Sequence, residues 1–232
     1  MNRLGLVGAI VLLASPSPTS AAPSPSALEA WQRYAAGVET HLARTRAVPR
    51  SPSDTSIAAS GESFAVPAGT ISHWRGSVFI RGVTLDRLLD GLRHPGTPPP
   101  QAEVVASRVL ALEGDSLRVY VRLVRHAIIT VTYDTEHTMS FARHSPAVAT
   151  ARSTATRIEE VGGADRGFLW RLQSYWRYEQ RPGGVRVELE SLTLSRSMPA
   201  VVRPVAMPLV NQIARESMIG TLDALKRFFE RA

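Results

Sequence analysis

Alternation of apolar and polar residues between residues 104 and 196 is the feature that most restricts how this chain can fold. In the stretch 117–123, leucine and valine at odd positions alternate with polar residues at even ones, namely Arg118, Tyr120 and Arg122. A period of two places one side of an extended strand in a core and the other in water. Successive strands of this kind, joined by short turns, form an antiparallel meander. The sequence therefore predicts an antiparallel sheet with one apolar face.

The predicted strands cover most of this region, and one earlier strand precedes them. They are Gly69–Gly82 (with a break at Gly76), Val104–Leu112, Leu117–Arg125, Ile128–Arg143, Val148–Glu160, Phe168–Gln180 and Val185–Arg196. Within Ile128–Arg143, one face carries the odd positions, which include Ile129, Val131, Tyr133, His137, Met139 and Phe141. We expect this face to point inward.

The last two strands form the clearest predicted hairpin. They are joined by Arg181-Pro-Gly-Gly184, a turn-forming sequence. Pairing residue 181 with residue 184 sets Trp176 opposite Leu189 and Tyr178 opposite Val187, and on the other face it sets Arg177 opposite Glu188 and Glu179 opposite Arg186. Opposite charges then meet on one face and apolar groups on the other. A slip of one residue would destroy both matches, so this register is predicted.

Three helices are predicted from spacings of three and four residues. The first runs from Ser26 to about Arg44, with Ser26 and Glu29 at the spacing of a capping box. A short helix follows Thr84, and a long terminal helix covers Leu209–Phe229 after a proline-rich lead-in. The stretch Pro49–Ser63 is rich in Pro, Ser, Thr, Asp and Gly and is predicted to be a loop or linker. The first helix cannot bury its apolar side alone, so we expect it to dock on the rest of the chain.

The N-terminus has the pattern of a cleavable signal peptide. Arg3 supplies the positive charge, the apolar run Leu4–Ala14 follows, and small residues up to Ala22 suit cleavage, which we place after Ala21. Eleven apolar residues form a helix of about 16 Å, against a hydrocarbon core of ~30 Å. We therefore expect an exported protein, periplasmic or secreted.

Composition excludes several classes of function. The chain has no cysteine, which excludes disulfides, thiol catalysis and thiolate metal sites. Its formal net charge is +7, and Lys226 is the only lysine. The bias towards arginine fits either a GC-rich genome or a cationic surface suited to peripheral contact with anionic membrane. Nucleic acid is not expected as a partner, because the arginines do not cluster with aromatic residues and the chain is exported.

This order of elements resembles the START-like, or helix-grip, superfamily of lipid-transfer domains and polyketide cyclases. The resemblance is carried by Gly76–Asp90, by Tyr175–Glu179 together with Gly183–Ser191, and by Glu216–Phe229. It implies an α+β fold in which a curved antiparallel sheet wraps around a long C-terminal helix, here with an extra N-terminal helix. The implied division is a signal peptide (1–21), an N-terminal helix and linker (22–63) and a START-like domain (64–232). The chain departs from the family after Asp90, where Gly91–Pro100 is rich in proline, at the mouth of the expected cavity.

The resemblance implies that a lipid or other apolar small molecule binds between the sheet and the terminal helix. The candidate ligand-binding residues are the large inward side chains Tyr133, His137, Met139, Phe141, Trp170, Leu172, Trp176 and Tyr178, with small residues such as Ala151 beside them. No catalytic motif is complete and the six histidines are scattered, so no catalytic residue, metal ligand or cofactor is predicted. Two alternatives stay open: a cyclase or dehydratase with His137 or Tyr133 as acid–base, and an interaction module with a filled core. The sequence does not indicate an oligomeric state.

Overall fold

The computed structural model of the chain describes residues 22–45, 56–93, 103–126, 130–162, 166–201 and 203–231. The predicted signal peptide, residues 1–21, lies outside them, as do residues 49–55 and 94–100. The helices are α1 (Pro25–Thr45), α2 (Leu85–Arg93) and α3 (Arg203–Arg231). The strands are β1 (Ala58–Val66), β2 (Gly69–Arg81), β3 (Val104–Glu113), β4 (Ser116–His126), β5 (Thr130–Ser145), β6 (Val148–Glu160), β7 (Arg171–Arg181) and β8 (Gly184–Arg196). Within the described ranges, no helix is both long and apolar enough to span a membrane.

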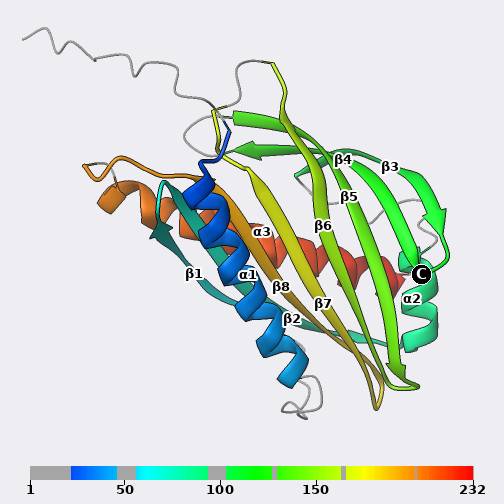
Figure 1. Cartoon of the computed structure of the whole chain (residues 1–232). Coiled ribbons are helices and arrows are strands. Elements are labelled where there is room, and N and C mark those ends of the chain that lie inside the picture. Colours follow the sequence, from blue (N-terminus) through cyan, green and yellow to red (C-terminus); the bar gives the residue numbers. More distant parts are fainter. Residues whose placement is uncertain are drawn as a thin grey trace, which may run out of the picture.

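All the strands belong to one antiparallel sheet in the order β1-β2-β8-β7-β6-β5-β4-β3. The sheet is curved, with α3 on one side, α1 on the opposite side and α2 beside the C-terminal end of α3 (Figure 1). We call the face towards α3 the inner face and the face towards α1 the outer face. This arrangement confirms the predicted α+β helix-grip fold.

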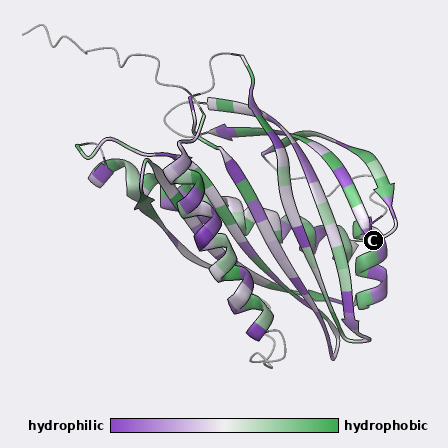
Figure 2. Cartoon of the chain, in the orientation of Figure 1, coloured by the Kyte–Doolittle hydropathy of each residue, from purple (hydrophilic) through white to green (hydrophobic). Residues whose placement is uncertain are grey.

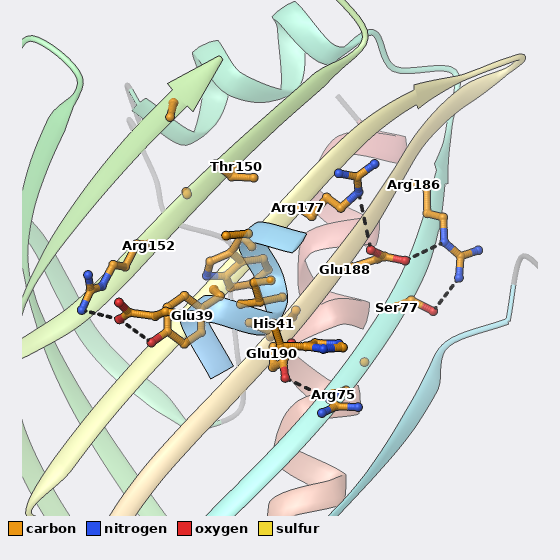
Figure 3. Close-up of a pocket in the computed structure, with 18 of the residues that line it drawn as sticks. Glu39, His41, Arg75, Ser77, Thr150, Arg152, Arg177, Arg186, Glu188 and Glu190 are labelled. Carbon is orange, nitrogen blue, oxygen red and sulfur yellow. Dashed lines mark hydrogen bonds and ion pairs between the residues drawn. The ribbon is translucent and has the colours of Figure 1, made fainter. Parts of the chain in front are cut away.

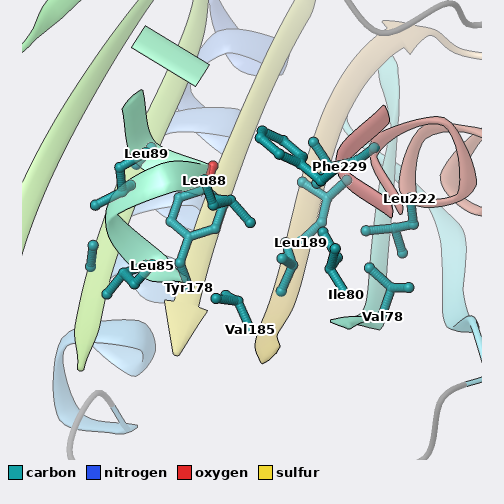
Figure 4. Packing of buried hydrophobic residues seen from close by; sticks show 14 of the residues in the cluster. Val78, Ile80, Leu85, Leu88, Leu89, Tyr178, Val185, Leu189, Leu222 and Phe229 are labelled. Carbon is teal, nitrogen blue, oxygen red and sulfur yellow. The ribbon is translucent and has the colours of Figure 1, made fainter. Parts of the chain in front are cut away.

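The main core lies on the inner face, between the sheet and the two helices α2 and α3 (Figure 4). Leu88 of α2 and Leu222 of α3 are fully buried there, and Phe229 closes the same cluster. Helix α3 packs close to β2 at Gly76, where an added Cβ would lie 2.6 Å from Leu222 Cδ1. The strand therefore needs glycine at this position for the helix to pack so near. β2 continues through Gly76, so the break predicted there is wrong.

Helix α1 docks on the outer face, as expected for a helix with one apolar side. Its buried residues pack against the end of the sheet formed by β2 and β8, and the cluster comprises Ala27, Trp31, Ala35, Val38, Ile71, Trp170, Leu192 and Leu194. The helix begins slightly earlier than predicted, because Ser24 and not Ser26 is its N-cap: the Ala27 amide donates to Ser24 Oγ at 3.2 Å. Pro25 then occupies the first helical position, where its missing amide hydrogen costs nothing.

Two other boundaries differ from the prediction. β1 lies partly within the stretch predicted to be a linker, so the proposed division between residues 63 and 64 falls inside a strand. The sequence of β1 is rich in small residues, and β1 is an edge strand that pairs with β2 alone. Both features explain why its alternation of apolar and polar residues is weak. Helix α3 begins at Arg203 instead of Leu209, and Pro208 lies inside it, where it cannot donate the helical hydrogen bond to the Pro204 carbonyl.

The hairpin register is confirmed residue by residue: Trp176 pairs with Leu189, Tyr178 with Val187, Arg177 with Glu188 and Glu179 with Arg186. Polar and apolar residues alternate along the strands (Figure 2). The charged side is less exposed than a solvated face would be, since the side chains of Arg177 and Glu188 are each 14% exposed. The two form an ion pair of 3.8 Å, and Glu188 also pairs with Arg186 at 3.4 Å.

Reversing either charge of the Arg177–Glu188 pair should destabilise the fold by more than the ~0.2–1 kcal/mol of an exposed pair, because each partner would be left beside a like charge with little solvent. We expect Arg177→Glu and Glu188→Arg each to lower the free energy of unfolding by about 2 kcal/mol, and the double swap to recover half of the summed loss or more. Urea unfolding of the three variants measures this. A double variant as unstable as the sum of the two single variants would mean that the two side chains do not interact.

Candidate functional site

The fold brings seven of the eight predicted site residues to one face. Tyr133, His137, Met139 and Phe141 lie on the inner face of β5, and Leu172, Trp176 and Tyr178 lie on the inner face of β7. The pairing shows this directly: Phe141 is opposite Ala151 of β6, which is opposite Trp176. β6 thus separates the two rows with small side chains, as the sequence predicted.

The inner face is filled at one end and more open further along. Close to α2, Tyr178 is fully buried beside Leu85 and Leu88 (Figure 4), and Phe141 is 6% exposed. Further along, six side chains on the same face are only partly buried, although they point towards the enclosed side; they are Val119, Val121, His137, Met139, Leu172 and Trp176. Beyond them on β4 and β5, Thr135, Leu123 and Tyr133 are buried again. Trp176 stacks on Tyr178 with ring centroids 6.3 Å apart and forms the boundary between the two parts. An incompletely covered apolar strip is what an apolar ligand would use.

The placement predicted for Trp170 is wrong. Its position has the same parity as Leu172 and Trp176, but β7 begins only at Arg171, so the alternation does not extend to residue 170. The Trp170 ring packs in the outer cluster with α1, under a turn in which Gly167 has a φ of +74° and an added Cβ would lie 2.9 Å from the indole nitrogen. Trp170 therefore belongs to the docking site of the N-terminal helix.

The polar groups on the inner side include the partly buried hydroxyls of Ser153, Ser174 and Ser191, which form one row across β6, β7 and β8. His137 Nε2 lies 3.0 Å from Thr135 Oγ1, and burial lowers the pKa of His137 to about 4. The buried indole nitrogen of Trp74 and the buried amide oxygen of Asn211 have no hydrogen-bond partner among the described residues. Sequence analysis missed Thr135, although its odd position on β5 placed it beside His137. It also missed Trp74 and Asn211, which only the packing of α3 on β2 makes relevant.

Two further facts bear on acid–base chemistry. Burial raises the pKa of Tyr178, so its phenol stays protonated. Tyr133 and His137, the acid–base candidates, are four residues apart on one strand, which separates them by about 13 Å. Tyr133 is 4% exposed and packs with Leu123 and Val131 in a separate cluster. The structure therefore does not bring these two side chains to one reacting atom.

A second candidate site lies on the outer face, between the C-terminal half of α1 and the sheet (Figure 3). This groove has a volume of about 820 Å³. Its charged lining residues are Glu39, Arg75, Arg152, Arg177, Arg186, Glu188 and Glu190. The carboxylates are shared between partners: Glu39 accepts from Tyr175 at 2.8 Å and pairs with Arg152 at 2.8 Å. Because opposite charges neutralise one another here, the groove has no strong preference for an anion.

A buried hydrogen-bonded cluster adjoins this groove and joins α1 to the sheet. Tyr34 of α1 contacts His73 Nδ1 at 2.7 Å, and His73 Nε2 contacts Glu190 Oε1 at 2.6 Å. Arg75 donates to the same carboxylate at 2.9 Å. Burial acts to raise the pKa of Glu190, but the hydrogen bond from His73 and the charge of Arg75 outweigh it, so this pKa is lowered. The alternating pattern placed Glu190 on this face, but only the docking of α1 buries it.

We expect the Glu190 cluster to make the fold sensitive to acid. Since the pKa of Glu190 is lower in the folded than in the unfolded chain, its contribution to stability is complete above the unfolded value of about 4.3 and is lost as the pH falls through the folded value. Between pH 6 and 3, the melting temperature of Glu190→Gln should start lower and fall less steeply than that of the wild type. Parallel melting curves for the two proteins would contradict this assignment. Glu29→Gln, on the exposed side of α1, is the matched control and should follow the wild type.

Comparison with known proteins identifies the fold. No family model matches the sequence, and no curated protein matches it. Among solved structures, the chain is similar to a STAR-related lipid transfer protein from Xanthomonas axonopodis, with a TM-score of 0.52 and 17% identity over 73% of this chain and 98% of that one. It is also similar to a protein of Thermus thermophilus, with a TM-score of 0.51 and 19% identity over 66% of this chain and 93% of that one. The chain therefore has the START-like, helix-grip fold.

Proposed function

We propose that this protein binds an apolar small molecule or lipid between the inner face of the sheet and α3, and carries or senses it. One observation carries the proposal: the strip of partly exposed apolar side chains on the enclosed face, which includes Val121, Met139 and Trp176. Such a strip loses water on binding an apolar molecule, at roughly 25 cal/mol per Å² of apolar surface. The fold of the Xanthomonas axonopodis lipid transfer protein supports the same class of ligand.

Native mass spectrometry of the purified mature protein tests this proposal. We expect a co-purified ligand, seen as a mass excess that an organic solvent removes, or saturable binding of the neutral probe N-phenyl-1-naphthylamine to the ligand-free protein. If the protein carries no excess mass and does not bind the probe, the ligand-binding proposal fails. The interaction module with a filled core would then be the better description.

The cyclase or dehydratase alternative is less well supported. It needs two titratable groups at one point of the site, whereas Tyr133 and His137 lie about 13 Å apart along β5. His137 alone remains placed to act on a bound molecule. Product analysis after incubation with a polycyclic aromatic substrate would detect turnover, and turnover abolished in His137→Phe would revive the enzyme hypothesis.

We also propose that the protein works outside the cytoplasm of a bacterium. The support is the pattern of residues 1–21, with Arg3, an apolar run of 11 residues and a small-residue cleavage region. Fusing residues 1–30 to a periplasmic reporter should export it, and the mature N-terminus should be Ala22. An exported protein that retains Met1 would contradict cleavage and indicate an anchor.

One end of the molecule carries the kinds of residues expected for peripheral contact with an anionic membrane. Phe168 and Val161 of the β6–β7 connection are 47% and 40% exposed, and Val201 before α3 is 91% exposed. The Arg196 amide donates to Gly167 O at 2.7 Å, which ties this connection to the end of β8 that leads to α3. Exposed apolar side chains among arginines suit an anionic lipid surface. Sedimentation with phosphatidylglycerol vesicles should exceed that with phosphatidylcholine vesicles and should weaken in Phe168→Ser; equal sedimentation would exclude this contact.

A further inference from the structure

His137 is a polar side chain in the open part of the inner face, where Ser153, Ser174 and Ser191 also lie. It lies opposite Val119 of β4 and opposite Ala155 of β6. The neighbouring residue on the same strand face, Met139, is also partly exposed. The residues directly opposite His137 are apolar, and the hydroxyl of Ser153 lies one pair further along on this face of β6, opposite Met139.

Hydrogen bonding determines which ring nitrogen carries the proton. Thr135 Oγ1 donates its single hydrogen to the Val121 carbonyl oxygen at 2.8 Å. The 3.0 Å contact between Thr135 Oγ1 and His137 Nε2 must then be donated by the histidine. In the neutral ring, Nδ1 is therefore a bare acceptor, and no described residue hydrogen-bonds to it. Burial lowers the pKa of His137 to about 4, so the neutral ring is the form present near pH 7.

The charges around this position are already compensated. Arg125, at the end of the inner face of β4, is ion-paired with Glu103 and donates to Ser217 Oγ of α3 at 2.6 Å. Glu136, the neighbour of His137, points to the outer face and pairs with Arg157 at 3.4 Å. A ligand carboxylate would thus meet a neutral acceptor at His137 and an arginine that already has an acidic partner.

We infer that His137 Nδ1 accepts a hydrogen bond from the ligand, so that the site selects neutral apolar molecules bearing a hydroxyl group over carboxylates or ethers with the same skeleton. This inference rests on the proposed function, because it concerns the same inner face. It assigns His137 as a residue that determines specificity and requires no chemical step.

Displacement of N-phenyl-1-naphthylamine from the mature protein by three matched ligands tests the inference: 1-dodecanol, dodecyl methyl ether and dodecanoate. We expect the alcohol to bind about tenfold more tightly than the ether or the acid, the size of one hydrogen bond in a shielded site. His137→Phe should remove this preference, with each ligand's affinity calculated from the probe affinity measured for that variant. His137→Gln, which keeps an acceptor oxygen, should retain part of it and serves as the second variant if the phenylalanine does not fold.

The outcomes separate the inference from the proposed function. Probe binding with equal affinity for alcohol and ether, or a preference that survives in His137→Phe, would overturn the inference and leave ligand binding intact. Tightest binding of dodecanoate would also overturn it and would point to Arg125 as the headgroup partner. A wild-type protein that binds neither the probe nor any of the three ligands would refute both.

Discussion

Replacing Gly184 by alanine should remove much of the protein's stability, with a loss of about 3 kcal/mol or more in the free energy of unfolding. An added Cβ at this position would lie 2.1 Å from the backbone oxygen of Ile80 and 2.9 Å from the Phe79 ring. Gly184 is the first residue of β8 and pairs with Arg81, so relief of the clash would require β2 and β8 to separate. A flexible side chain can move aside, but a backbone carbonyl within a sheet cannot.

Gly220→Ala is the matched control for this measurement. Gly220 lies within α3, and nothing lies within 4 Å of the position that a Cβ would take. The same substitution should here stabilise the protein by roughly 0.5–1 kcal/mol, because alanine favours helix. Guanidinium unfolding of both variants checks the pair. If both variants changed stability by the same small amount, the close approach of β2 and β8 at Gly184 would be refuted.

Trp176→Ala should weaken binding of N-phenyl-1-naphthylamine by about tenfold or more, because the indole supplies much of the apolar area on the open part of the inner face. Its cost in stability should stay below the ~3–5 kcal/mol of a fully packed aromatic, since a partly exposed ring makes fewer contacts. Tyr178→Ala is the matched comparison, because Tyr178 is fully buried and stacks on Trp176 with an interplanar angle of 10°. That variant should show the full loss of stability.

Probe titration and urea unfolding of the same two variants therefore distinguish a ligand site from a filled core. A large loss of stability in Trp176→Ala, with no probe binding even in the wild type, would refute the carrier and favour the interaction module. Unchanged probe affinity in a stable Trp176→Ala would instead place the ligand elsewhere, with the outer groove beside Glu39 as the next candidate.

The sequence determined those features that depend on neighbouring residues. Alternation of apolar and polar residues predicted the strands from β2 to β8, and the matched charges of Arg177 and Glu188 predicted the register of the last hairpin. Both follow from the local geometry of an extended strand, in which successive side chains point to opposite faces and a slip of one residue exchanges them. For the same reason, the inner face of β5, including His137, was predicted correctly.

The tertiary structure decided what depends on distant contacts. The alternating pattern gave no sign that it stops at Arg171, so only packing against α1 shows that Trp170 faces the outer side. The alternation of apolar and polar residues in β1 is weak, and the pairing with β2 is what identifies this segment as a strand. The tautomer of His137 depends on Thr135 donating to Val121 of a different strand, and the burial of Glu190 depends on the docking of α1, a helix far away in the sequence. Local patterns specify which side of a strand is apolar. The burial and hydrogen bonding of its side chains depend on which other segments of the chain cover that side, and those contacts form only in the folded protein.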